Sequence, residues 1–134
     1  MEQVKNILII DDDNVYRYTT EKYLKLLKLS KEVTVYSDAE EALGYLEANL
    51  NNKNIFPEII LLDVNMPILD GWQFIAEFQK LKGQLDQKLD LYMVSSSIDE
   101  RDEFRAKSLE GVKDFLVKPL NEAGMRKMVE DYQY

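Results

Sequence analysis

Aspartate residues follow two of the most apolar segments of the chain. Residues 4–10 ("VKNILII") run directly into Asp11 and Asp12, and residues 58–62 ("EIILL") run into Asp63. If the fold brings these carboxylates together, two of them about 4 Å apart repel by roughly 4 kcal/mol at an effective dielectric near 20. A cation or shared protons must offset that repulsion. Nothing else in the sequence supports peptide or glycoside hydrolysis by an acid pair, whereas Mg²⁺ binds carboxylate, phosphate and water oxygens.

Two further polar residues end apolar segments. Ser95 closes residues 89–95 ("LDLYMVS"), and Lys118 follows residues 114–117 ("DFLV"). A hydroxyl donor, an ammonium group, Mg²⁺ and a carboxylate are the components needed to place a phosphoryl group on an aspartate. The aspartate needs no general base, because it is already ionised at neutral pH. Together these residues predict phosphoryl transfer to an aspartate.

Each of these residues also has an ordinary structural interpretation. The acidic run 11–13 could form a solvated turn and a helix cap, and Asp13 is assigned to the cap. Asp63 alone could simply end a strand, since aspartate is disfavoured in strands and favoured in turns. Ser96 is an alternative to Ser95, because strand ends can be predicted only to within a few residues.

Composition excludes several classes of function. The chain has 134 residues, enough for one domain with its own core, and we expect a single domain over residues 1–134. The net charge of -8 argues against nucleic-acid binding, which requires clustered Lys and Arg. The absence of Cys and His removes disulfides, thiolate metal sites and the commonest acid–base group. No apolar run reaches the roughly 18 residues of a membrane span, and the N-terminus shows no secretory signal. We therefore expect a cytoplasmic protein with no membrane partner.

Five apolar segments of strand length alternate with helix-length segments. Several of the strand-length segments are continuously apolar, which is typical of strands covered on both faces. The predicted strands are residues 4–10, 33–36, 58–62, 89–95 and 114–117. The predicted helices carry apolar stripes, which are Tyr16, Thr20, Tyr23, Leu24 and Leu27; Ala39, Ala42, Leu43, Leu46 and Leu50; Ile75, Phe78 and Leu81; and Met125, Met128, Val129 and Tyr132.

The fourth predicted helix, at about 99–110, is an exception. Its apolar residues are Phe104, Ala106 and Leu109, and charged residues dominate the remainder, with Gly111 as a C-terminal stop. A helix with few apolar contacts is held less firmly than its neighbours. We therefore expect this helix to be the movable one.

The alternation predicts an α/β fold: a flavodoxin-like, doubly wound, five-stranded parallel sheet of order 2-1-3-4-5 with five helices. Ligands bind such sheets at the carboxyl ends of the strands, where the first and third strands are neighbours. The predicted strand ends are the positions of the aspartates, the serine and the lysine described above. The fold is therefore expected to gather them in one site.

Four short motifs of the sequence resemble those of a known protein family. "LIIDDD", "LLDVNMPILDG", "MVSSS" and "FLVKP" are similar, in this order, to the signatures of response-regulator receiver domains of two-component signalling. The resemblance runs from about residue 4 to 132. It implies a phosphoacceptor domain rather than an enzyme, with a sensor histidine kinase or a histidine phosphotransfer protein as donor.

The resemblance also implies roles for individual residues in the acidic pocket. Asp63 matches the phosphoacceptor. Asp12 would bind Mg²⁺ directly, with Mn²⁺ as a substitute, and Asp11 mainly through water. The backbone carbonyl of Asn65 would complete the protein ligands. Ser95 matches the hydroxyl position, where the family more often has Thr.

Further matches surround this pocket. Lys118 matches the invariant lysine that pairs with the phosphoryl group, and Pro119 the proline whose preceding bond is commonly cis. Phe115 matches an aromatic switch that turns inward when the hydroxyl moves, although a buried core aromatic is the ordinary interpretation. Pro67 shapes the loop over the site, and Gly71 belongs to the turn that begins the third helix.

Signalling is expected through the face formed by the fourth helix, the fifth strand and the fifth helix. A downstream protein, not identifiable from the sequence, would bind there, and the chain would be a monomer or a weak homodimer through the same face. Because the chain stops after the fifth helix, we expect no output domain. The cognate kinase and the lifetime of the phosphorylated state cannot be predicted.

Two alternatives remain for the function. Asp11 and Asp13 resemble the first motif of haloacid-dehalogenase-type phosphatases, in which Asp11 would be the nucleophile and Asp13 the acid–base group. That interpretation leaves Asp63 without a role, and no late acidic pair follows Lys118. The other alternative is a degenerate receiver that serves only as an adaptor, although every chemical position is filled.

Overall fold

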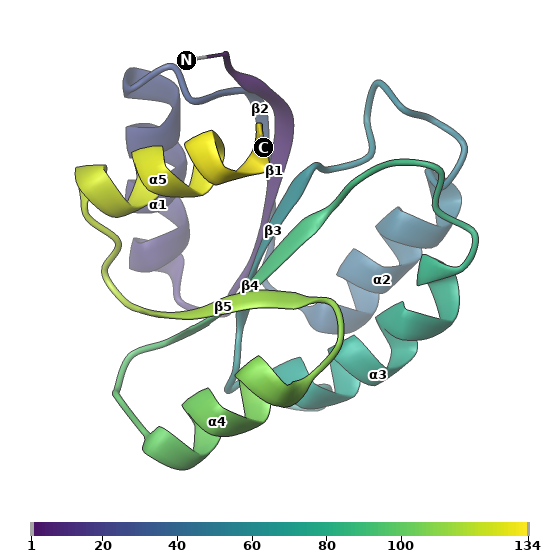
Figure 1. Cartoon of the computed structure of the whole chain (residues 1–134), viewed down its shortest axis with the longest axis vertical. Coiled ribbons are helices and arrows are strands. Elements are labelled where there is room, and N and C mark those ends of the chain that lie inside the picture. The colour runs from purple at the N-terminus through teal and green to yellow at the C-terminus, as the bar shows by residue number, and fades with distance from the viewer. Residues whose placement is uncertain (1, 134) are drawn as a thin grey trace.

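The computed structural model describes residues 2–133 and contains five strands and five helices in strict alternation (Figure 1). The elements are β1 (Val4–Ile10), α1 (Asn14–Leu26), β2 (Ser30–Tyr36), α2 (Ala39–Ala48), β3 (Ile59–Asp63), α3 (Gly71–Lys82), β4 (Asp90–Ser95), α4 (Glu100–Ser108), β5 (Val112–Val117) and α5 (Glu122–Tyr132). All strand pairs are parallel, and the order in the sheet is β2-β1-β3-β4-β5. The predicted fold class is confirmed.

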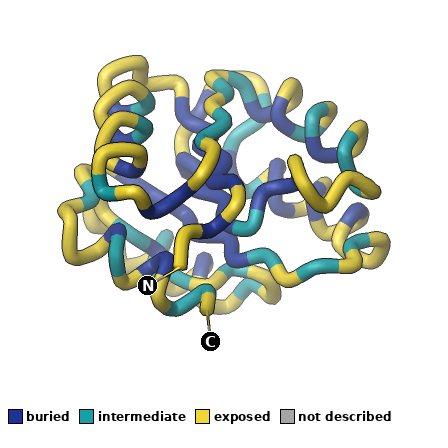
Figure 2. The backbone as a smooth tube through the Cα atoms, turned by 90° about the horizontal axis from the view of Figure 1, so that it is seen from above, coloured by how far each residue is buried: buried dark blue, intermediate teal, exposed yellow. Residues whose placement is uncertain are grey.

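Two hydrophobic clusters cover the two faces of the sheet, because side chains of successive strand residues point to opposite sides. In β1, Leu8 and Ile10 belong to the cluster beneath α2, α3 and α4, whereas Ile7 and Ile9 belong to the cluster beneath α1 and α5. The same division of helices is visible in Figure 1, and Figure 2 shows the buried segments concentrated in the middle of the molecule. Coverage on both faces explains why these strands are continuously apolar.

Most predicted bounds lie within a residue or two of the observed ones, and two strands are longer than predicted. β2 begins at Ser30 rather than at residue 33, because Val4 pairs with Ser30 in the parallel ladder. β5 begins at Val112 rather than at residue 114, next to Leu91 in β4. In both strands the additional residues are polar or sit beside a turn, so their apolar pattern is interrupted.

The apolar stripe predicted for α1 is wrong at Tyr23. Tyr16, Thr20 and Leu24 are buried, but Tyr23 is 54% exposed. Its neighbour Leu24 occupies the face directed at the sheet, and Tyr23 lies on the outer side. The expected scarcity of apolar contacts in α4 is confirmed, because only Ala106 is buried within this helix and Phe104 is 78% exposed. Its mobility stays a prediction.

Aspartates cap the N-terminal ends of four helices. Asp13, Asp38, Asp70 and Asp99 are the N-caps of α1, α2, α3 and α4, and each accepts hydrogen bonds from backbone N–H groups of the first turn. In α3, the side-chain oxygen of Gln73 accepts a hydrogen bond from the amide of Asp70 and completes a capping box. Within residues 2–133, no helix combines the length and the apolar character that crossing a lipid bilayer requires.

Candidate functional site

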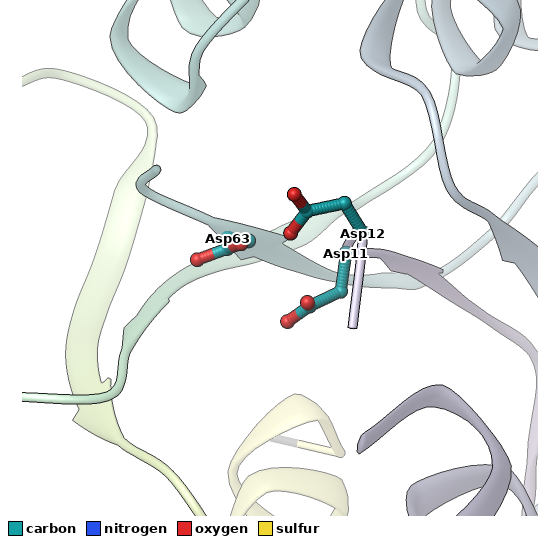
Figure 3. A group of neighbouring side chains, drawn as sticks. All are labelled: Asp11, Asp12 and Asp63. Atoms are coloured by element: carbon teal, nitrogen blue, oxygen red, sulfur yellow. The ribbon is translucent and has the colours of Figure 1, made fainter. Parts of the chain in front are cut away.

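Three carboxylates meet at the carboxyl ends of β1 and β3. Asp11, Asp12 and Asp63 each offer an oxygen atom, and these atoms all lie within 4.8 Å of one another (Figure 3). Asp11 and Asp63 are 1% and 5% exposed, whereas Asp12 is open to solvent. Two of the carboxylates therefore lie at the buried bottom of the site, and the third lies at its solvent-exposed side.

The sheet register brings these residues together. β1 and β3 are neighbours, with Ile10 beside Leu62, so the residues that follow them leave the sheet side by side. The amide of Asp11 donates to the carbonyl oxygen of Tyr36 at 3.0 Å, which extends the pairing with β2 by one residue. Asp63 is still part of β3, beside Val94. Two rigid strands thus position the buried carboxylates.

Asp13 has a different role from its two neighbours. Its Oδ1 accepts hydrogen bonds from the amides of Val15 and Tyr16, at 2.9 and 3.2 Å, and its own amide donates to Oδ1 of Asp11 at 2.9 Å. It is the helix cap predicted from the sequence, and it lies outside the group of three ligand-forming carboxylates.

Lys118 enters the acidic pocket from the end of β5. Its Nζ atom lies 2.7 Å from Oδ2 of Asp11 and 3.5 Å from Oδ1 of Asp63. The amide of Lys118 donates to the carbonyl oxygen of Ser95 at 2.8 Å, which holds the backbone of β5 beside the end of β4. The lysine side chain is 12% exposed, so its charge is applied to the carboxylates with little screening by water.

Burial controls the charge of Asp63. Burial, and after it the nearby charge of Asp11, raise the pKa of Asp63 to about 6, against the lowering effects of Lys118 and of the Asn65 amide. For Lys118, burial lowers the pKa, but the close negative charge of Asp11, together with that of Asp63, outweighs burial and raises it. The ammonium is therefore charged at neutral pH, and it faces the two buried carboxylates, Asp11 and Asp63.

The residues present fit a divalent metal ion. Oδ2 of Asp11 is buried and lies close to the ammonium, yet it makes no directional hydrogen bond among the described residues. Such an atom is available as a ligand, and a hard cation prefers the carboxylate oxygens assembled here. Asn65, two residues after Asp63, lies at the exposed side of the pocket and donates its amide to Oδ1 of Asp63 at 3.3 Å.

The remaining predicted residues surround this pocket. Ser95 is 1% exposed at the end of β4, whereas Ser96 is exposed, and the Ser97 amide donates to Oγ of Ser95 at 3.3 Å. The Lys118–Pro119 peptide bond is cis. Phe115 is 6% exposed and packs in the cluster that includes α4, so it occupies a core position in this structure.

The β3–α3 loop allows α3 to begin directly against the site. A Cβ atom at Gly71 would lie 2.6 Å from the carbonyl oxygen of Asp63 and 3.0 Å from Cα of Val64, so this position has room only for glycine. Pro67 is exposed in the same loop, where its carbonyl oxygen accepts a hydrogen bond from the Leu69 amide. The turn therefore brings the start of α3 directly against the backbone at the end of β3.

Sequence patterns did not reveal two side chains that contact the site. The ammonium of Lys118 lies 4.8 Å from the ring centroid of Tyr16, a residue assigned only to the core stripe of α1. The guanidinium of Arg17 donates to the backbone carbonyl of Asp11 at 2.6 Å. Both residues lie in the first turn of α1, immediately after the acidic run. Their closeness in sequence to Asp11 and Asp12 was the signal that could have predicted a contact with the site.

The comparisons with known proteins agree with this geometry. Residues 7–130 match the family model described as the response regulator receiver domain. The chain belongs to this family. The receiver domain is homologous to two-component response regulators, and its acidic pocket of Asp11, Asp12 and Asp63 fits a phosphoacceptor site. The match gives the phosphatase alternative no support.

Individual response regulators are similar to this chain in sequence over part of their own length. The two-component response regulator ARR11 of Arabidopsis thaliana is 34% identical over 115 residues, which are 85% of this chain and 20% of ARR11. A second relative, the probable transcriptional regulator ycf27 of Guillardia theta, is 29% identical over 90% of this chain and 42% of its own length. The chain thus spans less than half of either relative.

Solved structures have the same fold over nearly their whole length. The bacteriophytochrome response regulator AtBRR is 31% identical and has a TM-score of 0.74, with 98% of this chain and 94% of that chain covered. A two-component response regulator from Cytophaga hutchinsonii has a TM-score of 0.89 at 24% identity, with 98% of each chain covered. At the level of the family, receiver domains are signalling domains rather than conventional enzymes.

Proposed function

We propose that Asp63 accepts a phosphoryl group from the phosphohistidine of a sensor histidine kinase or a histidine phosphotransfer protein. The observation that carries this proposal is the single ammonium of Lys118 placed against the two buried carboxylates, Asp11 and Asp63, at the open end of the sheet. Homologues of the chain include the hybrid signal transduction histidine kinase I of Dictyostelium discoideum, which is 26% identical over 90% of this chain and 7% of that protein.

The proposed transfer forms one bond and breaks one. A carboxylate oxygen of Asp63 attacks phosphorus, the bond between phosphorus and the donor nitrogen breaks, and its electron pair stays on that nitrogen. The raised pKa of Asp63 marks a carboxylate that is poorly solvated and therefore a stronger nucleophile when it is ionised. Lys118 would exchange its contact with Asp11 for one with a phosphoryl oxygen, and the Ser95 hydroxyl, buried at the end of β4, would donate to another.

Asp11, Asp12, Asp63 and the backbone carbonyl of Asn65 would hold Mg²⁺, or Mn²⁺ in its place. When bound, the ion neutralises negative charge between the carboxylates and the incoming phosphoryl oxygens. A related receiver domain, that of the histidine kinase CKI1 from Arabidopsis thaliana, has been crystallised with Mg²⁺ and BeF₃⁻. We place the reaction in the cytoplasm, where ATP supplies histidine kinases with phosphoryl groups.

The proposed output is a change in the face formed by α4, β5 and α5, which an unidentified protein or a second copy of the chain would bind. Ser95 and Phe115 would act as the switch that links this face to Asp63. Within α4 only Ala106 is buried, and other contacts of the helix lie at its surface. They include Arg105, whose guanidinium lies 4.2 Å from the ring centroid of Trp72, and Lys107, 3.9 Å from Asp114. A helix attached in this way can be displaced at low energetic cost.

Incubation with Mg²⁺ and phosphoramidate tests the proposed acceptor. We expect an adduct with the mass of a phosphoryl group, stable in acid and labile in alkali, in the wild-type chain and not in Asp63→Asn. The matched control is Asp70→Asn, which changes a cap at the surface and is expected to form the adduct normally. An adduct that persists in Asp63→Asn but is lost in Asp11→Asn, together with steady release of phosphate by wild type, would favour a phosphatase instead. No adduct in any variant would leave only an adaptor.

Hydrogen exchange tests the proposed output. Amides of α4 should exchange faster than those of α1 and α3, and their rates should change when BeF₃⁻ and Mg²⁺ are added. Equal protection of the three helices, with no change on addition, would contradict a role for α4 in the switch.

A further inference from the structure

The aromatic ring of Tyr16 covers the ammonium of Lys118. The Nζ atom lies 4.8 Å from the ring centroid, within the distance at which the negative face of an aromatic ring attracts a cation. Tyr16 is 6% exposed and the lysine side chain 12%, so water contributes little to this contact. A desolvated cation–π contact is stronger than one at the surface.

The fold gives Tyr16 little freedom to leave this position. It lies in the first turn of α1, and its amide donates to the Asp13 cap. Its ring packs in the cluster shared by α1 and α5, where Met125 and Val129 are almost fully buried. The cap fixes the start of the helix directly after the acidic run, so the ring is held at the base of the pocket.

The contacts of Lys118 therefore differ in kind. Two are with carboxylates, Asp11 at 2.7 Å and Asp63 at 3.5 Å. These change during the proposed reaction, because Asp63 gains a phosphoryl group and a metal ion competes for the oxygens of Asp11. The contact with the Tyr16 ring carries no formal charge and involves no reacting atom. It is the contact that can persist before and after transfer.

We propose that Tyr16 is a positioning residue whose ring holds the ammonium of Lys118 in the pocket while the charges of the carboxylates change. The inference rests on the proposed phosphoryl transfer to Asp63. The ring, and not the hydroxyl, has this role, because the buried Tyr16 hydroxyl makes no hydrogen bond to the other described residues by distance and angle. An aromatic residue without a hydroxyl should therefore replace it.

The rate of adduct formation from phosphoramidate and Mg²⁺ tests the inference. A cation–π contact of this kind corresponds to about a threefold to thirtyfold change in rate. We expect Tyr16→Leu to slow adduct formation by that factor and Tyr16→Phe to remain within about twofold of wild type. Tyr18→Leu is the matched control, since Tyr18 lies on the same helix with a surface lysine, Lys22, 5.9 Å from its ring centroid.

The possible results separate the inference from the proposed function. No adduct in wild type would refute the proposed function itself. A wild-type adduct with Tyr16→Leu within twofold of wild type, or with Tyr16→Phe as slow as Tyr16→Leu, would refute the role of the ring. A general collapse of the pocket is distinguished by Mg²⁺ affinity, followed by the fluorescence of Trp72, which should stay within about twofold of wild type in Tyr16→Leu.

A second measurement needs no variant that might fail to fold. In wild type the ring should shift the NMR signals of the Lys118 Hε protons upfield of those of exposed lysines such as Lys22, and the shift should persist when Mg²⁺ and BeF₃⁻ are bound. Unshifted Lys118 signals, or a shift that disappears in the bound state, would overturn the inference.

Discussion

The Nζ atom of Lys118 lies 2.7 Å from Oδ2 of Asp11, although the strands that precede these residues are not neighbours. β1 and β5 are separated in the sheet by β3 and β4. The ion pair therefore spans the carboxyl ends of the central strands, and Asp63, at the end of β3, lies beneath it with a longer contact of 3.5 Å. In this arrangement the ammonium of Lys118 contacts Asp11 more closely than it contacts Asp63. It can therefore form a new contact with a group attached to Asp63.

Removal of the Lys118 ammonium should destabilise the fold. Asp11 and Asp63 are almost fully buried, and Lys118→Met would leave them without a cation when no metal is present. We expect the free energy of unfolding to fall by about 1–3 kcal/mol in urea titrations with a chelator. Lys113→Met, at an exposed lysine of β5, should change it by less than about 0.5 kcal/mol. Equal effects of the two variants would contradict the account of the pocket.

Asp63 should reduce stability at neutral pH. Its pKa in the folded state is about 6, above the ordinary value of 3.8, so the folded chain binds more protons than the unfolded chain between these values. The contribution of Asp63 is thus unfavourable once it ionises, and stability falls as pH rises from about 4 to about 6 and is constant above that. Asp63→Asn should raise the free energy of unfolding at pH 7, without metal, by about 1–3 kcal/mol.

The measurement is a set of urea titrations of wild type and Asp63→Asn between pH 4 and pH 8, with a chelator present. The difference between the two curves should grow through this window and then level off. Addition of Mg²⁺ should reduce the difference, because the ion stabilises the wild-type carboxylates. A difference that is constant with pH would show that folding does not raise the pKa of Asp63.

The different surroundings of Gly71 and Gly44 predict opposite effects of an alanine substitution at the two positions. At Gly71 a Cβ atom would lie 2.6 Å from the carbonyl oxygen of Asp63, so Gly71→Ala should destabilise the fold by about 1–3 kcal/mol and impair adduct formation. Gly44 lies inside α2 with nothing within 4 Å of a Cβ atom, and Gly44→Ala should stabilise the fold by about 0.5–1 kcal/mol. Thermal unfolding of the two variants checks both. A neutral Gly71→Ala would mean that the loop relaxes freely.

Asp12 and Asp13, adjacent in sequence, should have separable effects. Asp13→Ala removes a helix cap, and we expect about 1 kcal/mol of lost stability with adduct formation retained at saturating Mg²⁺. Asp12→Ala should leave stability nearly unchanged and weaken Mg²⁺ binding at least tenfold, since this exposed carboxylate belongs to the ligand group. Isothermal titration with Mg²⁺ and chemical unfolding distinguish the two. Loss of all reactivity in Asp13→Ala alone would revive an acid–base role for that residue.

The sequence was sufficient to predict the arrangement of the sheet and the membership of the acidic pocket, because both follow from one-dimensional patterns. Continuous apolar strands such as residues 58–62 require helices on both faces, and parallel strands place their carboxyl ends together. The polar residues at those ends, Asp11, Asp63 and Lys118, were therefore located in the fold by their neighbours in the chain. Their proximity is what the structure shows.

Contacts that depend on side-chain direction could not be predicted in the same way. Tyr16 fits the apolar stripe of α1, and no periodicity distinguishes a core tyrosine from one that also covers a lysine of β5. The contact of Arg105 with Trp72 likewise joins two helices whose separation is set only by packing. The start of β2 at Ser30 was missed because polar residues there are paired by the ladder and not by hydrophobic burial.

The central claim is that the phosphoryl group is attached to Asp63. Borohydride reduces an acyl phosphate of aspartate to homoserine, so reduction after incubation with Mg²⁺ and phosphoramidate, followed by tandem mass spectrometry, identifies the modified position. We predict homoserine at position 63 and at no other aspartate. Homoserine at position 11, or an unmodified aspartate at position 63 in a chain that carries the adduct, would contradict the account.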